Sequence, residues 1–116
     1  MRQLRRTLFF STIFILLLSP VAFAKTTINK INADPGRYHN KKVTIVGTVT
    51  DSYGVFTEGG YEIDDGTGKI WVLADRAVPA RGARVEVKGR VYTGLVFHGR
   101  NMGTAIRETG RKAKDK

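Results

Sequence analysis

Residues 61–72 read Tyr-Glu-Ile-Asp-Asp-Gly-Thr-Gly-Lys-Ile-Trp-Val. Apolar and polar side chains alternate on both sides of the Asp-Gly-Thr-Gly segment, a pattern typical of two antiparallel strands joined by a tight turn. The alternation places Ile63, Ile70 and Val72 on the interior face, so Trp71 should point outward. We expect the aspartates to hydrogen-bond the backbone of their own turn. A weak divalent-cation site is the alternative, but the oxygen spacing does not match an EF-hand loop, and we predict no metal.

Two segments that flank this hairpin have almost the same sequence pattern. Residues 43–49 read Val-Thr-Ile-Val-Gly-Thr-Val, and residues 85–91 read Val-Glu-Val-Lys-Gly-Arg-Val. A glycine in the middle of a strand weakens pairing and usually marks a bulge or a sharp bend. We therefore predict that Gly47 and Gly89 bend two strands of one small β-barrel.

The rest of the pattern supplies the other elements. A short helix over 26–33, capped by Thr27 and stopped by Pro35-Gly36, precedes the barrel. Residues 51–60 are interpreted as a loop and an irregular start of the second strand, with Gly59-Gly60 as a bulge or a turn. Thr93-Gly94 is predicted to be another turn. The expected strands cover residues 42–50, 61–64, 69–74, 84–92 and 95–108.

Five strands, a glycine bend in the first and fourth, and a short helix at one end resemble an OB-fold, the five-stranded Greek-key barrel. The spelling of residues 61–72 is similar to the second hairpin of the nucleic-acid-binding OB-fold superfamily, which includes synthetase anticodon-binding and single-strand-binding domains. The layout of an export segment plus one barrel is also similar to a family of small bacterial periplasmic OB-fold proteins. The resemblance covers roughly residues 28–108 and implies an all-β binding module rather than an enzyme.

The first 24 residues have the composition of a secretory signal peptide. Three arginines open the segment, residues 8–18 form an apolar run, and residues 22–24 supply the small-x-small cleavage motif Ala-Phe-Ala. The apolar run is short for a membrane span, although an uncleaved anchor is an alternative. We predict cleavage after Ala24, no transmembrane span in the mature chain, and a periplasmic or secreted bacterial protein. The Arg5-Arg6 pair leaves the twin-arginine route open beside the general secretory route.

Removing 24 of the 116 residues leaves 92, which is enough for one domain. We place this domain at residues 25–110, expect it to be a monomer, and expect residues 111–116 to form a disordered basic tail. The whole chain has a formal charge of +10, but residues 25–110 carry about +4, from 13 Lys and Arg against 9 Asp and Glu. This modest excess is a weak argument for an anionic partner. The absence of Cys excludes disulfides and thiol chemistry.

OB domains bind ligands mainly on the outer face of strands two and three, between the loops that follow strands one and four. On that face Trp71 would stack on a base or a sugar ring, with Lys69 nearby to contact charge. The alternative is that a loop or the helix covers Trp71. The loops would add aromatic and polar side chains, or use the aromatic ones to plug the barrel ends: Tyr53, Phe56, Tyr92, Phe97, His98 and Arg100.

Acidic residues crowd the second strand, which disfavours a phosphate-rich ligand there because polyanions bind through Lys and Arg. The bases gather around the fourth strand instead. They form either a solvated strand face or a site for an anionic lipid headgroup, a glycan or nucleic acid. These bases include Arg81, Arg84, Lys88 and Arg90.

No sequence motif points to catalysis or to a cofactor. His39 and His98 lie far apart in the chain, and neither has an obvious nucleophile beside it. The predicted function is that of an exported, non-enzymatic OB-fold binding module for an oligomeric or anionic ligand, such as single-stranded nucleic acid or an anionic oligosaccharide. The alternative is a protein–protein interaction domain of the bacterial cell envelope, acting as a stress or assembly factor.

Overall fold

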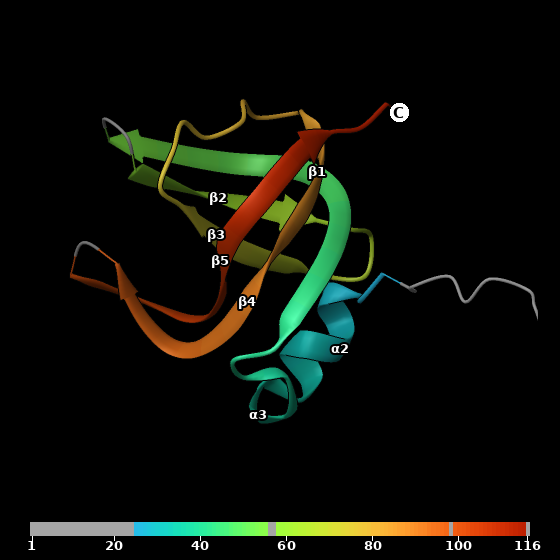
Figure 1. Cartoon of the computed structure of the whole chain (residues 1–116), viewed down its shortest axis with the longest axis vertical. Coiled ribbons are helices and arrows are strands. Elements are labelled where there is room, and N and C mark those ends of the chain that lie inside the picture. Colours follow the sequence, from blue (N-terminus) through green and yellow to red (C-terminus); the bar gives the residue numbers. More distant parts are fainter. Residues whose placement is uncertain (1–24, 56–57, 98, 116) are drawn as a thin grey trace, which may run out of the picture.

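A computed structural model describes residues 25–55, 58–97 and 99–115. Five strands close into a barrel in the order β1-β2-β3-β5-β4, and two short helices sit at one end of it (Figure 1). The predicted signal peptide lies outside the described residues. None of the helices in the described part of the chain has the length and hydrophobicity needed to span a membrane. The elements are α2 (Ile28–Ala33), α3 (Pro35–Tyr38), β1 (Lys42–Val55), β2 (Glu58–Asp64), β3 (Lys69–Ala74), β4 (Arg84–Phe97) and β5 (Arg100–Ala113).

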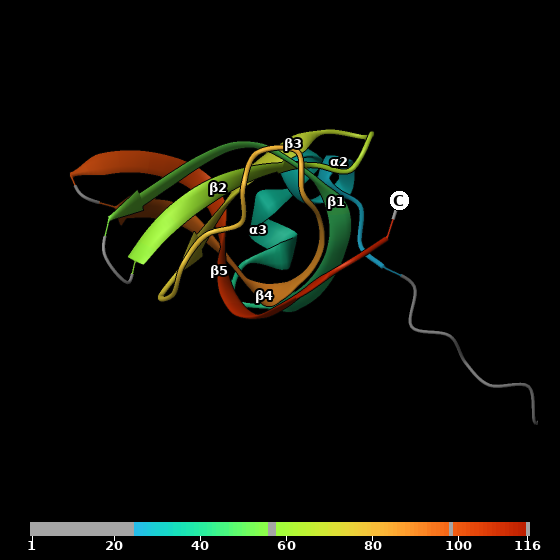
Figure 2. The same cartoon turned by 90° about the horizontal axis from the view of Figure 1, so that it is seen from above.

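All strand pairs are antiparallel except β3 with β5, which run parallel. β1 pairs with two strands. Its first half pairs with β4, where Val43 lies opposite Gly89, and its second half pairs with β2, where Val49 lies opposite Ile63. The resulting cylinder encloses the core and is seen from above in Figure 2.

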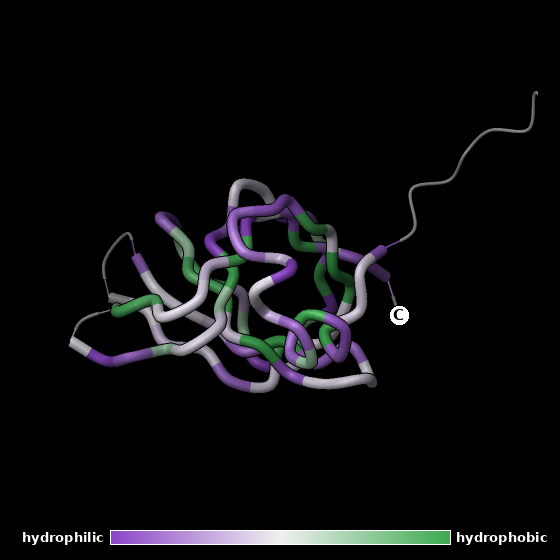
Figure 3. The backbone as a smooth tube through the Cα atoms, turned by 90° about the horizontal axis from the view of Figure 1, so that it is seen from below, coloured by the Kyte–Doolittle hydropathy of each residue, from purple (hydrophilic) through white to green (hydrophobic). Residues whose placement is uncertain are grey.

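The core follows the predicted alternation. Val43, Ile45 and Val49 of β1 are buried, and so are Ile70 and Val72 of β3. From α2, two isoleucines close one end of the barrel, and Tyr38 packs against the same cluster. Hydrophobic segments accordingly alternate with hydrophilic ones along the barrel strands in Figure 3. The prediction that Ile70 and Val72 face inward while Trp71 faces outward is confirmed.

Gly47 and Gly89 stand where two strands approach too closely for a side chain. A Cβ on Gly47 would lie 2.5 Å from the carbonyl oxygen of Asp64. A Cβ on Gly89 would collide with the backbone carbonyl of Arg107. The two similar segments therefore meet the same requirement at two places in one barrel, as predicted.

Two predicted loops are strands in the structure. Residues 51–55 extend β1 and pair with residues 58–62, so the expected loop over 51–60 is wrong for most of its length. Gly59 and Gly60 form neither a turn nor a bulge, because both pair with β1 and β3. This β1–β2 extension forms in this chain because the two segments satisfy each other's backbone hydrogen bonds beyond the barrel wall.

The β4–β5 hairpin is also longer than predicted. Thr93 and Gly94 continue β4 instead of forming a turn, and residues 95–97 belong to β4 rather than to β5. Positive φ angles at Gly94 (68°) and Gly103 (64°) accommodate the irregular register between the two strands. Residues 111–113, expected to be disordered, complete β5, because they pair with Val85, Glu86 and Val87 at the start of β4.

Candidate binding site on the outer face of the barrel

One row of side chains crosses four strands on the outside of the barrel. Glu62 lies opposite Trp71, Trp71 opposite Ala105, and Ala105 opposite Tyr92. Cross-strand partners point to the same face of a sheet, so the two aromatic residues flank a small alanine. We call Trp71, Leu73, Tyr92 and Ala105 the aromatic shelf.

Trp71 is half-buried, and its indole lies beside β2 at Gly60, a residue without a side chain. An ideal Cβ on Gly60 would sit 3.6 Å from the Cε3 atom of Trp71 and 3.2 Å from the Cδ2 atom of Leu73. The missing side chain of Gly60 therefore leaves room for both residues to lean over β2. Leu73 is 1% exposed, so this member of the shelf is buried.

Charges of opposite sign border the shelf. On the β2 side, Glu62 accepts a hydrogen bond of 2.9 Å from the hydroxyl of Thr50. Asp51 lies opposite Glu62 on β1 and forms an ion pair of 3.1 Å with Arg81. On the β5 side, Arg107 lies opposite Leu73 and is 3.7 Å from Asp75. The shelf thus has one acidic border and one basic border.

Two hairpin arms project beyond the shelf (Figures 1 and 2). The β1–β2 arm carries Tyr53, which lies opposite Gly60 and is 52% exposed. The β4–β5 arm carries Val96, which is 61% exposed, and Arg100, which is exposed at the start of β5. These arms replace the loops that the sequence predicted around the binding face.

The structure brings together only part of the predicted site. Lys69 is exposed two residues before Trp71 on the same strand, and Tyr53 borders the same face. Arg100 lies away from this row, opposite Phe97 in the outer part of the β4–β5 arm. Phe56 and His98 lie outside the described residues, and for Phe97 only the backbone in β4 is described.

Sequence reasoning missed the contribution of β5. Ala105 and Arg107 reach the shelf because β5 pairs in parallel with β3 over Trp71, Val72 and Leu73. Nothing in the sequence signals this register, since the paired residues are more than thirty positions apart and no single tight turn joins the two strands.

The turn between β2 and β3 ties the barrel to α2. The Asp65 carboxylate accepts hydrogen bonds from the backbone N–H groups of Thr67 (2.9 Å) and Ile28 (2.9 Å). Partial burial opposes ionisation of Asp65, but the bonds from Thr67, Ile28 and Gly68 outweigh it and lower the pKa of this carboxyl below its usual value. The predicted use of the aspartates within their own turn is confirmed, since Asp64 likewise accepts from the N–H of Gly66 at 2.8 Å.

A buried polar group lies inside the barrel, behind β2. The hydroxyl of Tyr61 donates to the carboxylate of Glu108, and Arg111 donates to the same oxygen at 3.0 Å. Arg111 also lies over the Tyr61 ring, 5.5 Å from its centroid, and donates to the carbonyl of Ala77. Burial and the hydrogen bond to Glu108 raise the pKa of Tyr61 well above its usual value. These partners satisfy one another, so the group is structural support for β2 and β5.

Comparisons with known proteins bear on the fold. No protein-family model matches the chain, and no curated protein matches it in sequence. Its structure is similar to asparaginyl-tRNA synthetase from Pyrococcus horikoshii, with a TM-score of 0.63 and 19% identity over 79% of this chain and 23% of that one. The chain has an OB-fold.

Two further OB-fold matches differ in how much of the other protein they cover. A putative aspartyl-tRNA synthetase from Leishmania major Friedlin gives a TM-score of 0.61 and 14% identity, over 82% of this chain and 22% of that one. The OBody AM3L09, solved bound to hen egg-white lysozyme, gives a TM-score of 0.60 and 19% identity, over 82% of this chain and 99% of that one. This chain therefore spans less than a quarter of either synthetase but matches nearly the whole OBody. At these identities the likeness concerns the fold alone.

Proposed function

We propose that this OB-fold chain is a non-enzymatic binding module that holds an oligomer of ring-shaped units across the aromatic shelf. The observation that carries the proposal is the in-register row in which Trp71 and Tyr92 flank Ala105. Neighbouring strands are about 4.8 Å apart, so the two aromatic residues stand about 10 Å apart with the buried Ala105 between them. An elongated ligand can stack on both rings in that arrangement.

The acidic border favours an oligosaccharide over single-stranded nucleic acid. The Glu62 carboxylate can accept hydrogen bonds, which sugar hydroxyls supply, whereas its charge would repel a phosphate backbone. Arg107 of β5 suits a carboxylate group, as in an anionic oligosaccharide. The nucleic-acid alternative draws support from the fold shared with the tRNA synthetases.

The proposal includes export. The composition of residues 1–24 supports a signal peptide, cleavage after Ala24 and a periplasmic or secreted module. A protein outside the cytoplasm meets cell-envelope glycans more often than nucleic acid, which agrees with the ligand class favoured by the acidic border. Detection of a mature protein that begins at Lys25 in the periplasmic or culture fraction would test this part.

The chain's single tryptophan makes the binding test direct. Trp71 fluorescence of the purified protein is followed during titration with neutral and anionic oligosaccharides and with single-stranded DNA, at two salt concentrations. We expect saturable quenching or a blue shift with an oligosaccharide, retained at high salt. Strongly salt-sensitive quenching by DNA alone would replace the oligosaccharide with nucleic acid. No response to any oligomer would reject the shelf as a binding site for these classes.

A second candidate function is docking of a cell-envelope protein. Tyr53 and Val96, the exposed large hydrophobic residues among those described, lie on the two arms. The similar OBody is itself bound to a protein, lysozyme. Replacing Val96, which lies on the β4–β5 arm, with serine should weaken a protein complex by about tenfold but leave oligosaccharide binding to Trp71 within about twofold, which separates the two functions.

A further inference from the structure

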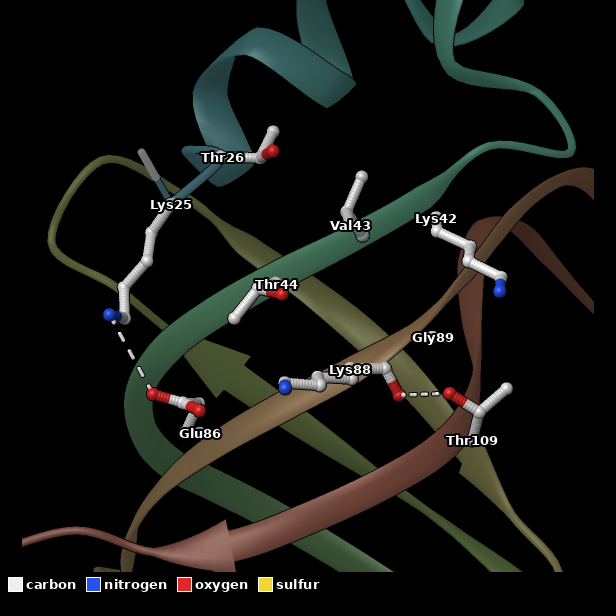
Figure 4. Close-up of a pocket in the computed structure, with 9 residues that line it drawn as sticks. All are labelled: Lys25, Thr26, Lys42, Val43, Thr44, Glu86, Lys88, Gly89 and Thr109. Atoms are coloured by element: carbon white, nitrogen blue, oxygen red, sulfur yellow. Dashed lines mark hydrogen bonds and ion pairs between the residues drawn. The ribbon is translucent and has the colours of Figure 1, made fainter. Parts of the chain in front are cut away.

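A concave surface lies between the N-terminal segment, β1 and β4, on strands that do not pair with β3. It is a groove of about 570 Å³, within the size range of small-ligand sites. Three lysines and three threonines from different segments line it (Figure 4). We call this surface the lysine groove and define it by Lys25, Lys42, Lys88, Thr26, Thr44 and Thr109.

Strand register explains why these residues meet. Thr44 of β1 lies opposite Lys88 of β4, and the backbone N–H of Thr26 donates to the carbonyl of Thr44 at 3.0 Å, which places Lys25 beside the groove. Thr109 donates its hydroxyl to the carbonyl of Lys88 at 3.2 Å. The lysines are thus presented by a paired backbone, so their spacing is set by the barrel itself.

Glu86 is the one carboxylate among the described residues that line the groove. It is 7% exposed and lies at one end, where it is 3.7 Å from the ammonium group of Lys25. Lys112 at the end of β5 and Lys114 just after it have their ammonium groups 3.6 and 3.8 Å from the same carboxylate. The single carboxylate of Glu86 therefore forms ion pairs with three ammonium groups at once.

The charge balance of the lysine groove leaves cations in excess. Partial burial opposes ionisation of Glu86, but the fields of Lys112, Lys25, Lys114 and Lys88 outweigh it and lower the pKa of this carboxyl. Glu86 is therefore ionised at neutral pH and already shared. Within the described parts of the chain, no carboxylate lies within ion-pair distance of Lys42 or Lys88.

The lining favours one ligand chemistry. No aromatic side chain among the described residues lines the groove, so it offers no ring for stacking on a base or a sugar. Ammonium and hydroxyl groups instead match the charge and the several acceptor oxygens of phosphate. Its compact size suits a small ligand better than a long polymer.

We propose that the lysine groove binds a compact phosphorylated ligand, contacted by Lys42 and Lys88. This site is separate from the aromatic shelf and does not depend on the function proposed for it. The phosphate comes either from a dissolved phosphorylated molecule or from a phosphomonoester lipid headgroup, which present the same chemistry to the lysines.

Inorganic tripolyphosphate is the first probe. Its binding to the purified protein is measured by isothermal titration calorimetry, with sodium sulfate at the same ionic strength as the reference. Lys42→Gln and Lys88→Gln should each weaken tripolyphosphate binding by about fivefold, and together by about twentyfold. Lys69→Gln is the matched control, because it removes the same charge from the opposite side of the barrel and should leave the affinity within about twofold.

Vesicles separate the two sources of phosphate. Sedimentation with vesicles of phosphatidylcholine containing phosphatidic acid, reversed by tripolyphosphate and reduced by Lys88→Gln, would identify a headgroup. Tripolyphosphate binding without sedimentation would identify a dissolved ligand. The proposal is overturned if neither probe binds more tightly than sulfate, or if Lys69→Gln weakens binding as much as Lys42→Gln and Lys88→Gln do.

Discussion

The aromatic shelf and the lysine groove are outward surfaces of one barrel, but they differ in nearly every chemical respect. The shelf is built on β3 and β5 around Trp71 and has an acidic border at Glu62. The groove is built on β1 and β4 around Lys42 and Lys88 and has no aromatic side chain among its described residues. Packing in the core requires apolar side chains at the inward positions of these strands, but it does not restrict the outward positions. A small closed barrel can therefore present two unlike surfaces at no cost to its core.

The largest expected effect tests whether both surfaces depend on the same bend. Gly89→Val would drive a side chain into the backbone of Arg107, and we expect it to lower the free energy of unfolding by about 3 kcal/mol or more. Because a domain of this size is only marginally stable, ligand binding at the shelf and at the groove should be lost together. Urea unfolding followed by circular dichroism measures the change.

Gly110→Ala is the matched control for that substitution. A Cβ at Gly110 meets nothing within 4 Å, so the variant should unfold within about 0.5 kcal/mol of the unmodified chain. Wild-type stability of Gly89→Val would show that the close approach of β4 and β5 does not require glycine.

The next effect separates the two surfaces. Trp71→Ala should weaken oligosaccharide binding by about tenfold or more, because a stacked ring contributes about 1–3 kcal/mol. The same variant should bind tripolyphosphate within about twofold of wild type. Calorimetry with each ligand is the measurement, since this variant has no tryptophan to follow. A parallel loss at both sites would mean that Trp71 supports the barrel rather than a ligand.

A smaller effect concerns the turn that links the two regions. Asp65 joins the β2–β3 turn to the N–H of Ile28 in α2, just after the segment that carries Lys25. Asp65→Asn should cost about 1–2 kcal/mol of stability at pH 7 by removing a charged acceptor from these N–H groups.

The pH dependence of Asp65 has a definite sign. Its pKa is lower in the folded chain, so its stabilisation is fully present above the unfolded value of about 3.9 and is lost as the pH falls through the folded value. Thermal melting between pH 7 and pH 2 should therefore show the stability gap between wild type and Asp65→Asn narrowing with acid. A gap that stays constant across this range would contradict the assignment.

The smallest effect sharpens the electrostatic contrast between shelf and groove. Glu86→Gln removes the carboxylate that three lysines share and should tighten tripolyphosphate binding by about threefold at low salt. The gain should shrink at 0.5 M salt because the charges are then screened over a few ångströms. Oligosaccharide affinity at the shelf should stay unchanged. Weaker tripolyphosphate binding by Glu86→Gln would show that Glu86 positions the lysines instead of competing with the ligand.

Local patterns predicted the barrel well where the core imposes alternation. The hairpin around Asp65, the strand over Lys69–Ala74 and the bends at Gly47 and Gly89 all follow from short-range rules. The arms were not predicted, because residues 51–55 and 93–97 each contain a glycine and polar residues, and they are held as strands by pairing within their own hairpins, with residues 58–62 and 100–103. Residues 111–113 were also predicted wrongly. Their basic composition is typical of a disordered tail, but they form a strand because they pair with β4.

For the candidate sites too, the sequence predicts some features, and others depend on strand pairing. Alternation alone places Trp71 outward, and composition alone shows that bases gather near the fourth strand. The parallel pairing of β3 with β5 was needed to set Ala105 and Arg107 beside Trp71, and the pairing of β5 with β4 to set Lys112 beside Glu86. The predicted loop residues Phe56 and His98 lie outside the described residues, so their roles stay predictions.

By itself, the sequence of this protein determined the closed barrel, its inward face and the outward direction of its one tryptophan, because burial and backbone sterics act over a few neighbouring residues. Only the tertiary structure decided which outward side chains meet. Strand register is set by the closure of the whole cylinder, and it joins residues that the chain itself keeps far apart.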